Sequence, residues 1–252
     1  MDLLPQTTPQ TIFCQAAAEG NVDKMKEMAS KDAKLVTGVD PDDRTAFHWA
    51  AGKNQVGAME FLVQSGFKKV GRVDEEGWSA LHSAASGGHL QSVAFILHHS
   101  KERQQKGEKG GVVDLDAQTS SGQTALHMAA GKGHMEVAKS LLEAGAEVDV
   151  KDRQQNTALA RACAASRQDI AALLIKQGAT TRTQERLTGD TPLHMAVNAQ
   201  HNGICEMLCK RDPHLLNVKN AEGKTPINEA PEELKVLLRE YEEKNEKGEN
   251  IN

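Results

Sequence analysis

The pattern of apolar and polar positions repeats along the chain at an almost constant interval. In residues 122–149 it consists of a polar turn, a short segment with paired alanines, a Gly-His pair and a second apolar segment. Comparable copies begin at Thr11, Thr45, Ser79, Thr124, Thr157, Thr191 and Thr225. Successive starts are 34, 34, 45, 33, 34 and 34 residues apart. Such a period predicts an array of repeated units instead of one globular core.

Each copy predicts a pair of helices. In the copy described above, Leu126 and Ala130 share one side of a first helix, and the small alanine lets a neighbouring helix approach closely. Gly133 interrupts that helix, Leu141 belongs to the apolar stripe of a second helix, and Gly145 provides a left-handed cap. Because one such unit cannot bury these stripes alone, each pair must pack on the next pair.

The fold class predicted from these helices is an all-α solenoid of about seven stacked helix-turn-helix units with short β-hairpin fingers. A finger is the turn-rich segment before a helix pair, as in residues 40–44 and 74–77. We expect residues 1–243 to form a single domain. Residues 244–252 are charged and aperiodic, so we expect them to form a flexible tail.

The one interval of 45 residues marks an insertion near residues 101–111. This segment is rich in Lys, Arg, Gln, Glu and Gly and has no apolar residue that could join the core. It therefore predicts an exposed loop or a short extension of the preceding helix. The alternative is a partner contact made by the basic side chains of Lys101, Arg103, Lys106 and Lys109.

The composition argues against several classes of protein. The chain has 38% hydrophobic but only 3% aromatic residues, which suits thin helical layers. Its net charge of -5 argues against a general nucleic-acid-binding protein, which needs a basic surface. Residues 1–10 lack the apolar core of a secretory signal, and no apolar run approaches the roughly 20 residues of a membrane helix. We expect a cytoplasmic protein, with a nuclear pool left open, that contacts neither membrane nor nucleic acid.

No constellation of side chains in the sequence is typical of an active site. Four histidines recur at one position of the repeat, where an imidazole can bond a finger to its helix; they are His48, His82, His127 and His194. The four cysteines lack a partner pair at zinc spacing, which favours ordinary thiols in a reducing compartment. We therefore expect no catalysis, no metal and no cofactor.

The candidate binding residues are side chains that the stacking of the units does not require. They lie in the fingers and on the first helices: Asp42, Arg44, Trp49, Glu75, Trp78, Met128, Lys132, Lys151 and Arg161. Exposed Trp and Arg side chains are typical anchors of protein interfaces, and the alternative for each Trp is packing between fingers. Acidic early fingers followed by basic middle fingers favour a protein partner of matching charge.

The period and the Thr-Pro-Leu-His opening at Thr191 are typical of ankyrin repeats, and the chain resembles that family. Two of its runs, Arg-Thr-Ala-Phe-His-Trp-Ala in residues 44–50 and Gly-Trp-Ser-Ala-Leu-His in residues 77–82, are similar to the gankyrin branch of the family. Gankyrins are subunits and assembly chaperones of the proteasome regulatory particle. Seven units with a truncated last one extend this similarity over most of the chain.

The resemblance implies a non-enzymatic chaperone whose concave face holds the C-terminal domain of an ATPase subunit of the proteasome base. The positions that match the contact pattern of that branch are Asp42, Arg44, Trp49, Glu75, Trp78, Lys132, Lys151 and Arg161. The insertion near residues 101–111 departs from the pattern. We expect the protein alone to be a monomer. The alternative function is a generic ankyrin scaffold or inhibitor that regulates a kinase or a transcription factor.

Overall fold

The computed structural model describes residues 8–107 and 112–247. Its internal contacts divide the chain into two compact units, which are described separately. Unit 1 comprises Met1–Ser120 with Glu143–Gly145, and unit 2 comprises Ser121–Leu142 with Ala146–Asn252. The expectation that residues 1–243 form a single domain stays a prediction.

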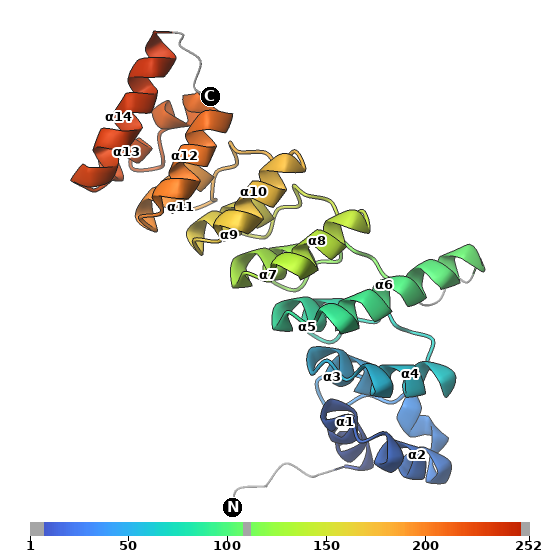
Figure 1. Cartoon of the computed structure of the whole chain (residues 1–252). Helices are drawn as coiled ribbons and strands as arrows, with labels where there is room; N and C mark the ends of the chain where they lie inside the picture. The colour runs from blue at the N-terminus through green and yellow to red at the C-terminus, as the bar shows by residue number, and fades with distance from the viewer. Residues whose placement is uncertain (1–7, 108–111, 248–252) are drawn as a thin grey trace, which may run out of the picture. The chain divides into compact units, whose positions relative to one another are not determined.

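Unit 1 contains three helix pairs. They are α1 (Pro9–Glu19) with α2 (Val22–Lys31), α3 (Ala46–Gly52) with α4 (Val56–Gln64), and α5 (Ala80–Gly87) with α6 (Leu90–Gln105); the short helix η1 (Ala33–Val36) follows α2. The first helices α1, α3 and α5 pack side by side in one layer, and α2, α4 and α6 form a second layer (Figure 1). This stacking confirms the predicted helix pairs.

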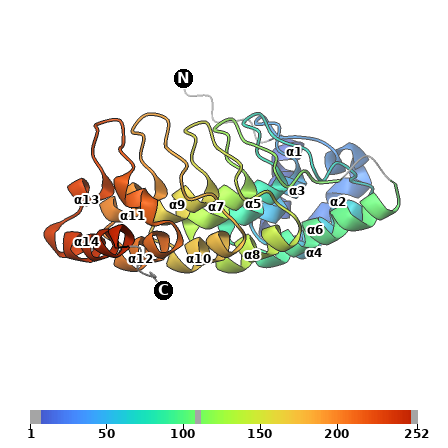
Figure 2. The same cartoon turned by 90° about the horizontal axis from the view of Figure 1, so that it is seen from above.

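Unit 2 contains four helix pairs. They are α7 (Ala125–Lys132) with α8 (Met135–Glu143), α9 (Ala158–Ala164) with α10 (Gln168–Lys176), α11 (Pro192–Asn198) with α12 (Asn202–Arg211), and α13 (Pro226–Glu229) with α14 (Glu232–Glu246); η2 (Pro213–Asn217) follows α12. The first helices α7, α9, α11 and α13 again pack on one another, and Figure 2 shows the fingers of this unit extending from their side. The fingers therefore stand beside the first helices.

Four of the first helices, α3, α5, α7 and α11, begin with a hydroxyl cap that a histidine completes. The Oγ1 of Thr45 accepts a hydrogen bond from the His48 backbone N–H at 3.4 Å, while the Thr45 N–H donates to Nδ1 of the same histidine at 3.2 Å. The same capping box occurs at Ser79–His82, Thr124–His127 and Thr191–His194. Because these histidines are buried, their recurrence reflects a structural role.

The other ring nitrogen of each of these histidines reaches the next finger. Nε2 of His127 donates to the Asn156 carbonyl at 3.0 Å, and the equivalent bonds join His48 to Trp78 and His194 to Lys224. Nε2 of His82 donates to the Ala117 carbonyl, at the position of the finger that corresponds to Arg72, a second acceptor of His48. Burial lowers the pKa of His48 and of His127. The neutral imidazole thus connects a first helix to the following finger, which confirms the role predicted for it.

The core of both units consists of aliphatic side chains and alanines, with few aromatic rings. Ala50, Ala84, Ala129 and Ala162 of the first helices have no exposed surface, so the helices approach closely. All four cysteines are free thiols and buried. Burial raises the pKa of Cys14 to about 11 and that of Cys205 to about 12, which keeps both thiols protonated.

The fingers are simpler than the predicted β-hairpins. Single antiparallel bridges join Val39 to Thr45 and Val73 to Ser79, and the described residues contain no longer strand. The predicted insertion begins as a helix, because α6 continues through Gln105, while residues 108–111 lie outside the described residues. Helix α14 likewise continues to Glu246, and residues 248–252 of the predicted tail lie outside the described residues.

Candidate functional site

Four fingers are built around one Asp or Asn side chain. Oδ1 of Asp74 accepts hydrogen bonds from the backbone N–H groups of Glu76 at 3.0 Å and Trp78 at 2.7 Å. The same pair of bonds, to the residues two and four positions later, is formed by Asp40, Asp152 and Asn220. This side chain closes the turn, because it accepts hydrogen bonds from two backbone N–H groups of the finger that no β-strand pairing satisfies.

The second oxygen of these aspartates binds several of the predicted site residues. Oδ2 of Asp40 accepts from Trp49 Nε1 at 2.7 Å, and Oδ2 of Asp74 accepts from Arg44 Nε at 2.9 Å. In unit 2, Oδ2 of Asp152 accepts from Arg161 Nε at 3.0 Å. Arg44, Trp49 and Arg161 are therefore oriented by the fingers, and each still exposes part of its side chain.

In unit 1 the two fingers and the helices α3 and α5 enclose a hollow of about 230 Å³. It is lined by Arg44, His48, Trp49, Gly52, Lys53, Asp74, Trp78 and Ser83. The Arg44 guanidinium lies 5.8 Å from the centre of the Trp49 ring, a cation–π distance. Three residues predicted from the sequence, Arg44, Trp49 and Trp78, are thus brought together in one partly exposed site.

The surroundings of this hollow carry charge of both signs. Asp42 and Glu75 are exposed in neighbouring fingers, and the Glu75 N–H donates to the Asp42 carbonyl at 3.4 Å. The hydrogen bond to Asp74 raises the pKa of Arg44, so the guanidinium stays charged. Exposed Lys53 adds a second cation to the lining of the hollow. Five of the nine predicted residues therefore belong to this region of unit 1.

Trp49 also borders a second, smaller hollow in unit 1. It has a volume of about 170 Å³ and is lined by Thr11, Cys14, Gln15, Ala18, Asp40 and Trp49. The indole thus separates two concavities and is held between them by its bond to Asp40. Partial burial, which was the alternative for each tryptophan, applies to both of them, but it leaves ring surface exposed to the hollows.

The other four predicted residues lie in unit 2 and differ in exposure. Lys132, at the end of α7, and Lys151, in a finger, are exposed, and Arg161 is half-buried against Asp152. Met128 is buried, with only 6% of its surface exposed, so it differs from the other predicted residues, and its role as a partner contact stays a prediction. An unbranched thioether has no polar tip that must reach the surface, so its burial leaves no polar group unsatisfied.

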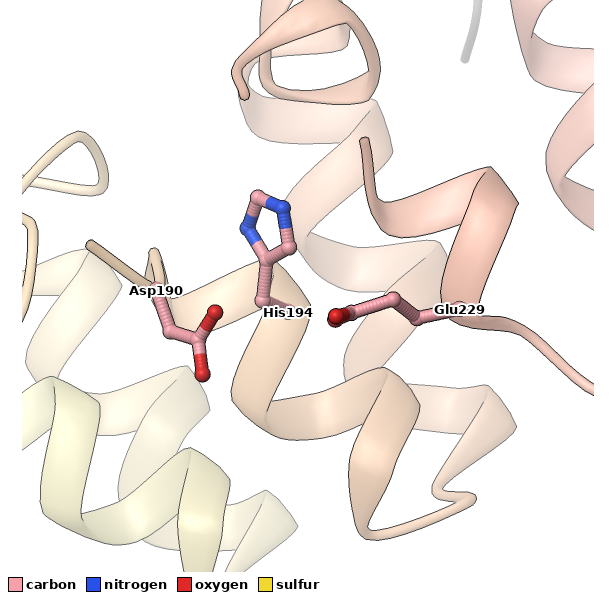
Figure 3. A group of neighbouring side chains, drawn as sticks. All are labelled: Asp190, His194 and Glu229. Atoms are coloured by element: carbon pink, nitrogen blue, oxygen red, sulfur yellow. The ribbon is translucent and has the colours of Figure 1, made fainter. Parts of the chain in front are cut away.

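A cluster of Asp190, His194 and Glu229 in unit 2 has the composition of a metal site, with ligand atoms within 4.8 Å of one another. Figure 3 shows the two carboxylates pointing toward each other beside the helix that carries His194. The Asn220 amide donates to Asp190 Oδ1 at 2.9 Å and to Glu229 Oε1 at 3.0 Å. His194 is engaged by Thr191 and the Lys224 carbonyl, whereas Oε2 of Glu229 is buried without a hydrogen-bond partner among the described residues.

The Asp and Asn residues that orient the site were not predicted from the sequence. A signal was present, because four of them precede the helix cap by the same five positions: Asp40 and Thr45, Asp74 and Ser79, Asp152 and Thr157, Asn220 and Thr225.

None of the helices in residues 8–107 and 112–247 is long and apolar enough to cross a membrane.

Comparisons with known proteins identify the repeat. The sequence model described as "Ankyrin repeats (3 copies)" matches residues 13–109 and 106–185, and that described as "Ankyrin repeat" matches residues 188–221. The human ASB11 ankyrin repeat domain superimposes with a TM-score of 0.76 over 91% of this chain and 96% of that domain. At 23% identity this similarity establishes the fold alone.

Curated relatives match shorter parts of the chain. Neurogenic locus notch homolog protein 1 of Danio rerio is 36% identical over 110 residues, which is 43% of this chain and 4% of that protein. Neurogenic locus Notch protein of Drosophila melanogaster is 32% identical over 136 residues, which is 48% of this chain and 5% of that protein. E3 ubiquitin-protein ligase KEG of Arabidopsis thaliana is 34% identical over 120 residues, which is 46% of this chain and 7% of that protein. The matches thus span a small fraction of these much longer proteins.

Proposed function

Because the chain belongs to the ankyrin-repeat family, whose members are generally non-enzymatic protein-interaction modules, we propose that it is a gankyrin-like assembly chaperone of the proteasome regulatory particle. Its partner in this proposal is the C-terminal domain of an ATPase subunit of the proteasome base. The protein works in the cytoplasm, with a nuclear pool left open.

The observation that carries the proposal is the hollow of unit 1 between Trp49 and Trp78. The two sequence runs that resemble gankyrins each contain one of these tryptophans, and the fold places both side chains along the same hollow. Trp and Arg are enriched among the residues that dominate interface energies, and here Arg44 accompanies the two rings.

The site is suited to binding because its side chains are already oriented. Asp40 holds Trp49 and Asp74 holds Arg44, so little side-chain entropy remains to be lost when a partner binds. The charges of Asp42, Arg44 and Glu75 favour a partner with complementary charges. A standard interface needs about 800 Å² from each protein, an area that a few fingers and first helices can supply.

Affinity purification from cells of the organism that encodes the chain tests the proposal. The tagged chain should recover regulatory-particle ATPases as its main partners in mass spectrometry. A variant with Arg44→Glu and Lys151→Glu should recover less of them, because both positions match basic contacts of the gankyrin branch. A double variant with Lys24→Glu and Lys210→Glu, which reverses two exposed lysines of second helices, is the charge control.

The same purification separates this function from the alternative. A scaffold or inhibitor of a kinase or a transcription factor would recover such a protein as the main partner, without ATPases of the proteasome base. Recovery of no base ATPase by the wild-type chain would reject the proposed function. Equal recovery by wild type and the Arg44→Glu, Lys151→Glu variant would reject these two residues as contacts.

A further inference from the structure

The finger before α11 is one residue longer than the four fingers that contain the Asp or Asn turn. In those fingers five positions separate the turn residue from the helix cap, whereas Glu185 precedes the cap Thr191 by six. Glu185 takes the role of the turn residue, because its Oε2 accepts from the N–H groups of Leu187 at 2.8 Å and Thr188 at 2.6 Å. The longer side chain thus closes a longer turn.

The additional residue leaves Leu187 projecting from the finger. Its exposed fraction of 77% is the largest of any large apolar side chain in residues 8–107 and 112–247, and the next is Val236 at 61%. Isolated exposed leucines are common and by themselves indicate nothing. What distinguishes Leu187 is that the loop around it is fixed by several hydrogen bonds.

Backbone bonds tie this finger to the fingers on both sides of it in unit 2. The Arg186 N–H donates to the Gln154 carbonyl at 2.8 Å, and the Ala221 N–H donates to the Thr188 carbonyl at 2.8 Å. The side-chain amide of Gln184 donates to the carbonyls of Gly189 at 2.9 Å and Lys219 at 3.1 Å. An apolar side chain on a loop held in this way can bind a partner without a large cost of ordering the loop.

Positive charge lies beside Leu187. Arg186 is its neighbour in sequence, and Arg153 belongs to the adjacent finger, next to the residue that receives the Arg186 N–H. Both arginines are exposed, and within residues 8–107 and 112–247 neither side chain has an ion pair or hydrogen bond. A surface with an apolar tip and two available guanidinium groups is complementary to an apolar socket with carboxylates at its rim.

We propose that Leu187 is an anchor residue that inserts into an apolar, acid-rimmed socket on the partner protein, where Arg153 and Arg186 pair with the carboxylates of the rim. This inference rests on the proposed function and deepens it, since it assigns the socket to the C-terminal domain of the base ATPase subunit. The anchor lies in unit 2 and involves none of the residues that the resemblance assigns as contacts.

The test measures the affinity of the full chain for the purified C-terminal domains of the base ATPases by calorimetry. Leu187→Ala should weaken binding about tenfold, because the buried leucine loses most of its apolar surface. Leu187→Asp should weaken binding further, since it places a carboxylate against an acidic rim. Leu187→Met, which keeps the volume and the apolar character, should bind within about threefold of wild type.

Two further variants control the experiment. Val236→Ala removes another exposed apolar side chain of unit 2, on α14, and should leave the affinity unchanged. Arg153→Glu with Arg186→Glu should weaken binding, and the difference from wild type should shrink as salt is added. Circular dichroism and urea unfolding of each variant should match wild type, because all the altered side chains are exposed.

The outcomes separate this inference from the proposed function. If wild type binds an ATPase domain and the Leu187→Ala and Leu187→Asp variants bind equally well, the anchor is rejected while the proposed function stands. If wild type binds none of the ATPase domains, the proposed function is rejected and the anchor with it. Weaker binding by Val236→Ala as well as by Leu187→Ala would also reject the anchor, because the effect would not depend on the finger.

Discussion

The Nε–H of Arg44 donates to Oδ2 of Asp74 at 2.9 Å and so links one finger of unit 1 to the next. Only 2% of the Asp74 side chain is exposed, whereas 37% of the Arg44 side chain is. The carboxylate is therefore a structural group, and the guanidinium that it orients remains available at the surface. The same bond thus stabilises the fold and positions a candidate contact.

Asp74→Ala should destabilise the protein by about 2 to 3 kcal/mol, because it removes a buried charged acceptor from two backbone N–H groups and from Arg44. The free energy of unfolding in urea measures the effect. Glu75→Ala, at the next and exposed position, should change stability by less than about 0.5 kcal/mol. Equal effects of the two substitutions would contradict the role assigned to Asp74.

Trp49→Ala should reduce the affinity for the partner by about 2 kcal/mol, the usual loss at a buried aromatic anchor. Trp49→Phe keeps a ring but loses the bond to Asp40, so we expect an intermediate affinity. Leu90→Ala, a change to an exposed apolar residue of α6, should have no effect. Affinity for the base ATPase domain is the measurement, and an unaffected Trp49→Ala variant would show that the hollow is not used.

The stability should fall as the pH is lowered from about 6.5 toward 5. Burial lowers the folded-state pKa of His48 and of His127 from the ordinary value of 6.5, so the unfolded chain binds more protons in this range. The stability contributed by the neutral rings is complete above the unfolded pKa and is lost below it. Urea unfolding at pH 7.5, 6.5 and 5.5 measures the slope.

Replacing His127 isolates the contribution of one imidazole to the dependence of unfolding free energy on pH. His127→Gln cannot gain a proton, so its stability should depend less on pH between 6.5 and 5.5 than that of wild type. His98→Gln, which replaces an exposed histidine outside the repeated position, is the control and should keep the wild-type slope. Identical slopes in all three proteins would show that His127 does not titrate differently in the folded state.

The four thiols should be unreactive in the folded protein. Burial raises the pKa values of Cys14 and Cys205 to about 11 and about 12, and it also raises those of Cys163 and Cys209. Because the thiolate is the reactive species, iodoacetamide at pH 8 should label none of them within minutes, and all four after urea is added. Mass spectrometry counts the labels, and fast native labelling at any position would mean that this part of the core opens readily.

The sequence was sufficient for features that depend on local periodicity. The helix pairs follow from apolar spacing within each unit, and the role of His127 follows from its fixed distance to Thr124. Features that depend on side chains thirty positions apart were not predicted, such as the bond of Arg44 to Asp74. The bonds of Trp49 to Asp40 and of Arg161 to Asp152 span only nine positions and were also not predicted, because they depend on how the finger folds back against its own first helix.

Exposure was also harder to predict than position. Met128 and Arg161 follow their helix caps by the same four positions, yet the first is buried and the second reaches Asp152. The difference arises because a guanidinium must keep polar partners, whereas a thioether can fill an apolar gap. The longer finger at Glu185 could be read from the sequence, but the exposure of Leu187 depends on how that turn closes.

The histidine bonds give the array a direction. Each imidazole donates a hydrogen bond to a finger that lies later in the chain. Removing repeats from the C-terminal end therefore leaves an imidazole N–H without its acceptor. Removing them from the N-terminal end leaves a finger without the imidazole that binds it. In unit 2 this series of histidine bonds is interrupted at α9, where Ala160 occupies the position of the histidine. The finger at Glu185 therefore receives no imidazole bond and is held by the Glu185 side chain and by backbone bonds to the fingers on both sides, so a shortened protein that ends before this finger leaves no histidine without its acceptor there.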